Sequence, residues 1–528
     1  MDADQGLPLP QRYWAILVVA LGITLAVLDG AIANVALPTI ARNLNASPAD
    51  SIWVVNAYQL AITVSLLPLA SLGDRIGYRR VYMSGLALFT IASFGCALSG
   101  SLTSLAIARV IQGFGAAGIM SVNTALVRVI YPSEHLGRGV SINASVVAIS
   151  SVIGPTIASG VLAVATWPWL FAINVPIGIA AYALGRKALP RTPGHHQPYD
   201  YLSALMNAAV FGLAITAIDG LGHGEHRSYV LAEFLVAGII GYFFVRRQLT
   251  QAAPLLPIDL LRIPVFALSI ITSFCSFTAQ MLTFVSLPFL LQNTFGMSQV
   301  LTGFLMTPWP LVIVFIAPLA GMLSDRYSAG VLGGIGLAIM TAGLLLLATT
   351  GAHPTPVDIA WRMAVCGLGF GLFQSPNNRQ MLSSAPRHRS GGASGMLGTA
   401  RLSGQTLGAA LVALIFGVAP QHGTIITLIV AAGFAAAAAM VSLMRISRSK
   451  TPAAARSGLG RPRQISFQYS LVGTPFAELN ERGFVARSRF VQYTKELISW
   501  LIPSRVTRSQ FLLSMASNKP NWSNRKRR

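Results

Sequence analysis

Residues 13–37 read YWAILVVALGITLAVLDGAIANVAL and carry a single charged side chain, that of Asp29. An apolar run of about 18 or more residues predicts a helix that spans a lipid bilayer. This run is too long for the apolar part of a secretory signal, and no small-residue cleavage site accompanies it, so we expect it to stay in the membrane. The first apolar stretch therefore predicts an integral membrane protein.

The composition of the whole chain leads to the same conclusion. Of its 528 residues, 53% are apolar and only 10% are charged, and the mean hydropathy is +0.62. Soluble domains carry about 25% charged residues. Sixteen acids and 38 bases are too few to cover the surface of a soluble protein of this size, so the composition excludes a soluble enzyme.

Further apolar runs of spanning length follow the first along the chain. The predicted spans lie near residues 14–37, 52–72, 81–99, 104–127, 139–164, 168–189, 201–219, 230–249, 264–291, 298–323, 331–350, 357–381, 393–418 and 421–443. Fourteen is an even number, so both termini lie on the same side of the membrane.

Basic residues in the short loops indicate which side that is, because cytoplasmic loops accumulate Lys and Arg. The loops that follow even-numbered spans carry fifteen Lys and Arg residues, and the opposite loops carry three. We therefore predict a multi-pass protein of the cell inner (cytoplasmic) membrane with cytoplasmic N- and C-termini.

The net charge of +22 is unevenly distributed along the chain. Residues 1–444 have a net charge of +8, and residues 445–528 have a net charge of +14. The excess therefore belongs to a basic cytoplasmic tail, and we expect no nucleic-acid partner. Bases scattered among apolar residues could hold the tail on an anionic leaflet, but disorder is the favoured interpretation.

A weak internal repeat divides the chain. Leu72-Gly73-Asp74-Arg75 ends the second span, and Leu323-Ser324-Asp325-Arg326 ends the tenth, 251 residues later. Duplicated six-span halves are a transporter architecture with the substrate site between the halves. We predict an N-terminal six-helix bundle over 1–190, two inserted transmembrane helices over 191–262, a C-terminal six-helix bundle over 263–444 and the tail over 445–528.

Charged residues deep in spans are the strongest functional signal, because each is costly in a bilayer unless it is paired or hydrated. Asp29 lies roughly 12 Å, and Arg109 roughly 8 Å, from the outer ends of their spans at 1.5 Å per residue. Their similar depth permits an ion pair. We favour Asp29 as a proton carrier over a static pair that only fixes helix packing.

The other intramembrane charges carry weaker signals. Asp219 and Glu233 flank a short outer loop, where simple solvation is the favoured interpretation. Arg401 lies deep in the thirteenth span, and structural anchoring and substrate contact are equally open for it. All eight histidines fall in loops, which argues against a histidine proton relay.

Two glycine patterns require interpretation. Residues 113–118 read GFGAAG and match the dinucleotide-binding fingerprint, but they lie in an apolar span with no strand before them. Close helix packing is the better explanation. Gly154-Pro155 interrupts helical hydrogen bonding within the fifth span and predicts a kink.

Several motifs together resemble the major facilitator superfamily, and specifically its fourteen-span drug:proton antiporter family, over about residues 12–444. They are LDGAIANVALP (28–38), LGDRIGYRR (72–80), RVIQG (109–113), Gly154-Pro155, WPWLFAINVPIG (167–178) and GLFQSPNN (371–378). The sequence departs from the family pattern at Ala70, Ala158 and Ser159, where the family usually has glycine. No acid lies in the tenth span, so a preference for divalent cations is unsupported, whereas Asp29 is available for monovalent cations.

The resemblance implies roles for particular residues. It implies proton coupling by Asp29 and Arg109 and an antiporter motif at Gly154 and Pro155. It implies a gating loop made of Asp74, Arg75, Gly77, Arg79, Arg80, Asp325 and Arg326. Our candidates for the substrate cavity are Asn34, Tyr58, Gln59, Gln112 and Arg401.

We therefore predict an all-α integral membrane protein with the major facilitator fold. We expect an antiporter, not an enzyme, that exports amphipathic cationic drugs and biocides such as quaternary ammonium compounds and dyes. The proton gradient drives it without a cofactor or metal, and small molecules, protons and the bilayer are the expected partners, with no obligatory protein partner. The alternatives are transport of an endogenous metabolite and a non-transporting sensor or scaffold.

Overall fold

The computed structural model describes residues 6–194, 199–222, 224, 226–251, 254–386 and 389–449. Within these ranges the regular structure is entirely helical. The tail from residue 450 onward, for which we predict disorder, lies outside the described residues. The part of the tail that is described differs from the prediction, because α17 continues through Arg445 to Ser449 and buries the Arg445 side chain.

Seventeen α-helices and three short helical turns follow one another along the described chain. In order they are α1 (Leu9–Asn43), α2 (Pro48–Ser51), α3 (Trp53–Ile76), α4 (Tyr78–Ala97), α5 (Leu102–Ile130), η1 (Ser133–His135), α6 (Leu136–Val164), α7 (Pro168–Ala172), α8 (Asn174–Ala188), α9 (Tyr201–Gly222), α10 (Arg227–Thr250), η2 (Ile258–Arg262), α11 (Pro264–Phe289), η3 (Leu290–Thr294), α12 (Gln299–Met306), α13 (Pro308–Leu323), α14 (Ala329–Ala348), α15 (Pro356–Ser384), α16 (Ser390–Val418) and α17 (Gly423–Ser449).

Fourteen of these helical segments are long and apolar enough to cross a membrane, which confirms the predicted number of spans and the fold class. Four segments combine two consecutive elements, namely α2 with α3, α7 with α8, α11 with η3, and α12 with α13. The helices extend beyond the predicted apolar cores, and α1 runs from Leu9 to Asn43 instead of 14–37. Polar and basic residues continue a helix past the hydrocarbon region, because backbone hydrogen bonding does not require apolar side chains.

Local sequence signals set several helix ends. Ser101 and Ser104 form a capping box at the start of α5, and Thr355 and Asp358 form one at the start of α15. Each box satisfies backbone N–H groups that have no partner within the helix. Gly77 ends α3 with a φ of 100°, a conformation that only glycine adopts without strain.

Glycines let helices of the first half approach one another closely. A Cβ atom on Gly113 would lie 2.6 Å from the carbonyl oxygen of Tyr58, and one on Gly118 would lie 2.9 Å from the Cα atom of Gly85. The GFGAAG stretch therefore packs α5 against α3 and α4, which confirms the packing interpretation of this motif.

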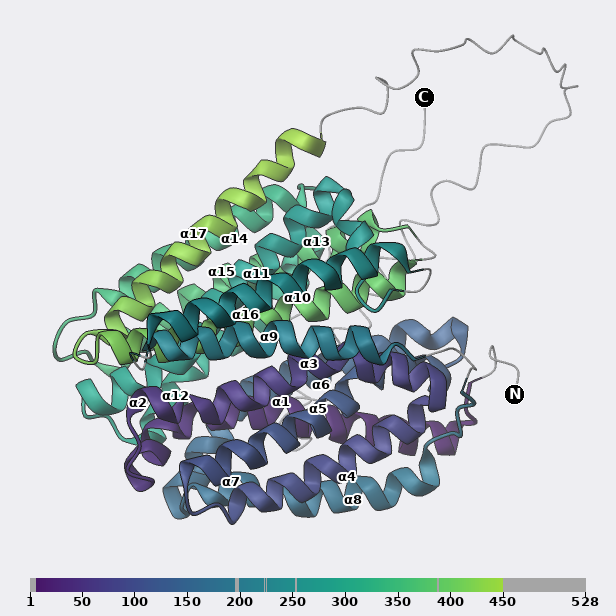
Figure 1. Ribbon diagram of the computed structural model, residues 1–528, viewed down its shortest axis with the longest axis horizontal. Coiled ribbons are helices and arrows are strands. Elements are labelled where there is room, and N and C mark those ends of the chain that lie inside the picture. The colour runs from purple at the N-terminus through teal and green to yellow at the C-terminus, as the bar shows by residue number, and fades with distance from the viewer. Residues whose placement is uncertain are drawn as a thin grey trace, which may run out of the picture. The chain divides into compact units, whose positions relative to one another are not determined.

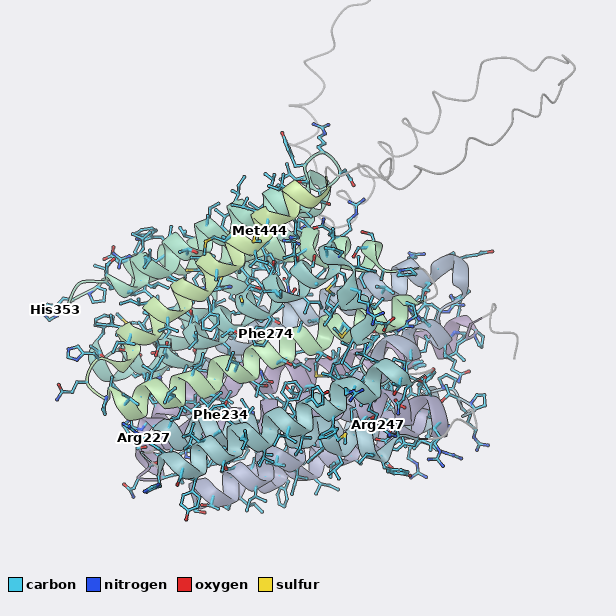
Figure 2. The ribbon with its side chains drawn as sticks, turned by 45° about the horizontal axis from the view of Figure 1, so that its top comes forward. Arg227, Phe234, Arg247, Phe274, His353 and Met444 are labelled. Atoms are coloured by element: carbon cyan, nitrogen blue, oxygen red, sulfur yellow. The ribbon has the colours of Figure 1, made fainter. Side chains whose placement is uncertain are left out.

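The two helices that we predict to be an insertion, α9 and α10, have a different environment. Helix α9 packs against α10 and also against α3 and α16, which come from different halves of the chain (Figure 1). In Figure 2, Arg227 and Arg247 mark the two ends of α10, and Phe234 lies between them. Large apolar side chains on α10 such as Leu231 and Leu235 are more than 60% exposed. An exposed apolar surface of this kind is suited to contact with lipid tails.

Candidate functional site

Asp29 lies in the middle of α1 and is 1% exposed. Its Oδ2 atom forms an ion pair with the guanidinium of Arg109 from α5. Its Oδ1 atom accepts hydrogen bonds of 2.9 Å from the Gln112 side-chain amide and of 2.9 Å from that of Asn174 in α8. The carboxylate thus joins three helices, and both of its oxygens are engaged.

Arg109 is completely buried beside Asp29. Its Nε donates to the carbonyl oxygen of Val54 over 2.8 Å, and its guanidinium carbon lies 4.0 Å from the centre of the Tyr58 ring and 5.5 Å from that of Phe171. Aromatic faces attract a desolvated cation. A buried pair of this kind makes removal of one partner costly, about 3–5 kcal/mol in soluble proteins, because the other charge stays behind.

Gln112 connects the ion pair to its surroundings. It accepts a hydrogen bond of 2.7 Å from Arg109, and its amide donates to Asp29 and, over 2.9 Å, to the Ser93 hydroxyl of α4. We predicted that Gln112 lines the substrate cavity, but its side chain is completely buried, and its contacts position the ion pair.

Sequence reasoning missed Asn174 and Ser93 as members of this site. Asn174 lies in the motif at residues 167–178, and a buried amide in an apolar span is the signal that could have singled it out. Ser93 offers no such signal, because serines are common in these spans and usually bond to their own helix.

The remaining cavity candidates have different environments. The Tyr58 hydroxyl donates to the carbonyl oxygen of Ala26 over 2.8 Å, so this residue is a wall of the Asp29 site. Asn34 is 5% exposed, and its Oδ1 atom has no hydrogen-bond partner among the described residues. Gln59 donates to Gln405 of α16 over 3.3 Å. Arg401 lies one helical turn before Gln405 and is partly buried.

The first predicted gating loop lies between α3 and α4. The Tyr78 hydroxyl donates to Asp74 over 2.7 Å, and the guanidinium of Arg75 lies 3.5 Å from the Tyr201 hydroxyl of α9. Asp74 and Arg75 form no ion pair with each other, because the aspartate faces Tyr78 in its own turn.

The rest of this loop is attached to the last turn of α8 and to the segment that follows it. The Arg79 backbone N–H donates to the Thr192 hydroxyl over 3.0 Å, and its guanidinium donates to the carbonyl oxygen of Arg186. A Cβ atom on Gly77 would collide with the Thr192 backbone. Arg80, in the first turn of α4, donates to the carbonyl oxygen of Ile76 at the end of α3 over 3.3 Å.

The equivalent loop of the second half does contain an ion pair. Asp325 lies 2.5 Å from the guanidinium of Arg379 in α15, and both side chains are about 60% exposed. Arg326 is exposed.

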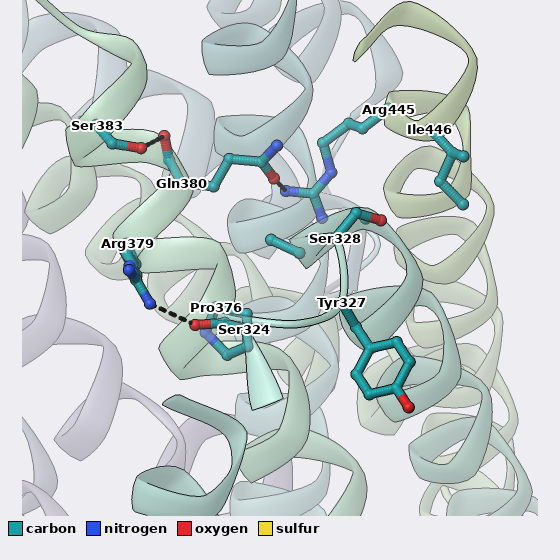
Figure 3. Close-up of a pocket in the computed structure, with 11 residues that line it drawn as sticks. Ser324, Tyr327, Ser328, Pro376, Arg379, Gln380, Ser383, Arg445 and Ile446 are labelled. Carbon is teal, nitrogen blue, oxygen red and sulfur yellow. Dashed lines mark hydrogen bonds between the residues drawn. The ribbon is translucent and has the colours of Figure 1, made fainter. Parts of the chain in front are cut away.

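A cavity of about 240 Å³ adjoins the Asp325–Arg379 pair and is lined by residues of α14, α15 and α17 that include Arg379, Gln380 and Arg445 (Figure 3). The Arg445 guanidinium donates to Gln380, Asn377 and Ser269, so it is satisfied by neutral groups.

Gly154 and Pro155 lie on α6, which packs against α1 from the first half of the chain and α12 from the second half. A Cβ atom on Gly154 would lie 2.7 Å from the Cβ atom of Ala31 in α1, two residues after Asp29. Ser159 donates to the carbonyl oxygen of Pro155 over 3.0 Å and contacts Gly303 of α12. The serine that replaces a family glycine therefore faces a glycine on the partner helix, which preserves the close approach.

Asp219 and Glu233, near the facing ends of α9 and α10, are less solvated than we expected. Both side chains are partly buried, and one carboxylate oxygen of each is shielded from solvent.

The other ends of α9 and α10 are joined outside the membrane-spanning segments by Asp200. Burial raises the pKa of this carboxyl group, but hydrogen bonds from Ser203, Gln251 and Arg247 outweigh that effect, so its pKa lies well below the usual range. The Arg247 guanidinium lies 3.0 Å from the carboxylate.

Fourteen apolar helices around a buried ion pair, with matching loops 251 residues apart, define a multi-pass membrane protein of the transporter class. The family model of the Major Facilitator Superfamily matches residues 19–409. This chain belongs to the major facilitator superfamily, and the fourteen-span drug:proton antiporter family is consistent with the helices and the relatives.

The similar proteins include transporters of different named substrates. The chain is 57% identical to the uncharacterized transporter YebQ of Escherichia coli (strain K12), over 86% of this chain and 99% of the relative. It is 31% identical to the riboflavin transporter RibZ of Clostridioides difficile (strain 630), over 77% and 88% of the two chains. It is 30% identical to the tetracenomycin C resistance and export protein of Streptomyces glaucescens, over 76% of each.

Proposed function

We propose that this protein is a proton-coupled antiporter that exports amphipathic organic compounds as protons enter, without enzymatic activity. The observation that carries the proposal is the buried carboxylate of Asp29, whose bonding partners come from α5 and α8. Protonation of Asp29 would remove its charge and weaken its bonds to Arg109, Gln112 and Asn174. The packing of α1 against these two helices would then change with the protonation state, which is the coupling that an antiporter needs.

The direction and driving force are part of the same proposal. We infer that the protein lies in the cell inner membrane with cytoplasmic termini, since the basic loops favour that orientation. The proton gradient would supply the energy, with no cofactor and no obligatory protein partner. The relative named for tetracenomycin C resistance and export supports an outward direction.

The family resemblance and the geometry at Asp29 favour different charges for the substrate. The resemblance to drug antiporters favours cationic compounds such as quaternary ammonium biocides. The geometry at Asp29 does not favour direct binding of a cation, because both carboxylate oxygens already accept hydrogen bonds.

Reconstitution in liposomes tests the proposed function. A pH gradient is imposed, and substrate-dependent proton movement is recorded for a panel of cationic, anionic and neutral dyes. Proton movement that accompanies export of at least one dye is the expected result. Dye transport that is indifferent to the pH gradient would contradict proton coupling.

A second candidate is the transport of an endogenous metabolite. The similarity to a riboflavin transporter over most of both chains favours it. Adding riboflavin to the same panel separates the two candidates, because a metabolite transporter would move riboflavin and reject the dyes.

A further inference from the structure

Arg401 is a charged side chain near the middle of a membrane-spanning helix. It lies 11 residues after the start of α16 and 17 before its end. At 1.5 Å per residue, the nearer end is roughly 16 Å away. A guanidinium at this depth is costly unless it is paired or hydrated.

The structure assigns no hydrogen-bond or ion-pair partner to this guanidinium among the described residues. Its guanidinium carbon lies 6.0 Å from the centre of the Phe277 ring of α11, in a cation–π contact. The Nε atom is shielded from solvent and has no hydrogen-bond acceptor. The two terminal nitrogens have no acceptor among the described residues either, and the side chain is only partly buried.

The two fully buried arginines among the described residues each donate several hydrogen bonds, although one terminal nitrogen of Arg109 has no acceptor. Arg109 has the Asp29 carboxylate, and Arg445 donates to five oxygen atoms, of Gln380, Asn377, Ser269 and Ser442. A structural anchor would show bonds of this kind. The sequence position of Arg401 leaves structural anchoring and substrate contact open. The absence of such bonds favours substrate contact.

The position of Arg401 suits contact with a transported molecule. One turn further along α16, Gln405 bonds to Gln59, and the hydroxyls of Thr406 and Thr63 lie 2.8 Å apart. These contacts join α16 to α3, so Arg401 lies close to a boundary between the two halves of the chain. Substrate sites of duplicated transporters lie between such halves.

We propose that Arg401 recognises the acidic group of an amphipathic organic anion, and that such anions are the substrate class of this transporter. The proposal rests on the proposed export function. A guanidinium presents a planar set of donors that matches a carboxylate in two parallel hydrogen bonds. The Phe277 ring beside it offers an apolar, aromatic surface to the body of the same molecule. Asp29 does not compete for Arg401, because its oxygens are engaged with Arg109, Gln112 and Asn174.

Two dyes of similar shape and opposite charge test the substrate class. The purified full-length protein is reconstituted in liposomes with a pH gradient, and transport of fluorescein, an anion, is compared with that of ethidium, a cation. We expect fluorescein export by the wild-type protein and a reduction of about tenfold or more in Arg401→Gln, because a loss of about 1.4 kcal/mol of binding free energy corresponds to tenfold. Arg401→Lys should restore part of the rate. Arg227→Gln, the same change at an exposed arginine, should transport fluorescein like the wild type.

Thermal unfolding of the same variants distinguishes recognition from anchoring. Arg401→Gln should unfold near the wild-type temperature or above it, because among the described residues the substitution breaks no hydrogen bond or ion pair. Arg445→Gln, which breaks five hydrogen bonds, should unfold several degrees lower.

The outcomes separate the two proposals. Export of ethidium but not fluorescein would overturn the anion inference and leave the proposed function standing. Wild-type fluorescein export by Arg401→Gln, or a loss of stability equal to that of Arg445→Gln, would also overturn the inference. Proton movement with none of the panel compounds would overturn the proposed function itself.

Discussion

Asn174 donates a hydrogen bond of 2.9 Å to the carboxylate of Asp29, although 145 residues separate the two along the chain. The contact brings α8 to the same carboxylate that α5 approaches through Arg109 and Gln112. The ion pair is therefore one part of a polar cluster that joins α1, α5 and α8 at the Asp29 carboxylate and reaches α4 through Ser93. Protonation of Asp29 would change the packing of α1 against both α5 and α8, because each of these helices contacts the Asp29 carboxylate.

The first prediction concerns the charge of Asp29. Asp29→Asn should abolish proton-coupled efflux while the protein still inserts in the membrane, because the amide keeps the shape of the side chain but cannot carry a proton. Drug resistance is compared in cells that express matched amounts of wild type and variant. Undiminished resistance in the variant would rule out Asp29 as the proton carrier.

The second prediction concerns the loop between α3 and α4. Asp74→Asn should slow turnover more than it weakens substrate binding, because Asp74 bonds to Tyr78 in a turn and lies outside the Asp29 cluster. Asparagine keeps an oxygen that can accept from Tyr78 without the charge, whereas Tyr78→Phe removes the hydrogen bond and should slow turnover at least as much. Binding of a fluorescent dye and its transport rate at saturation are measured separately, and loss of binding with an unchanged rate would refute the gating role.

The third prediction concerns the packing of α4 against α5. A Cβ atom on Gly115 would collide with the backbone of Phe89, whereas one on Gly100 would meet nothing within 4 Å. Gly115→Ala should therefore destabilise the protein by roughly 1–3 kcal/mol, the usual cost of overpacking. Gly100→Ala is the control and should unfold like the wild type in detergent. Equal unfolding temperatures for the two variants would contradict the packing described here.

The fourth prediction concerns pH and the connection between α9 and α10. The pKa of Asp200 is lowered in the folded protein, so its charged form adds stability at pH values above the unfolded pKa of about 3.9. That contribution falls as the pH drops from there towards the folded pKa. Asp200→Asn should thus be less stable than the wild type at pH 7, and the difference should shrink below about pH 4. A stability difference that is constant down to pH 3 would contradict this assignment.

The amino-acid sequence alone determined the membrane architecture. Whether a segment spans a bilayer depends on its own length and apolarity, so fourteen helices follow from local composition. The depth of Asp29 and Arg109 in the membrane follows from counting residues along their helices. Because the two depths are similar, the ion pair could be predicted from the sequence. The motif glycines at residues 113–118 could be assigned to packing because they lie within an apolar run.

Only the tertiary structure decided which side chains meet. Asn174 reaches Asp29, Arg379 reaches Asp325, and Arg445 enters the helical core instead of the tail, because each helix has a particular rotation and neighbour. The tertiary structure also shows that Arg401 has no acceptor within the described residues, whereas Arg109 donates to Asp29, Gln112 and the carbonyl oxygen of Val54. Helix rotation and pairing depend on close packing between segments distant in sequence. The hydropathy of a single segment does not predict which other helices pack against it.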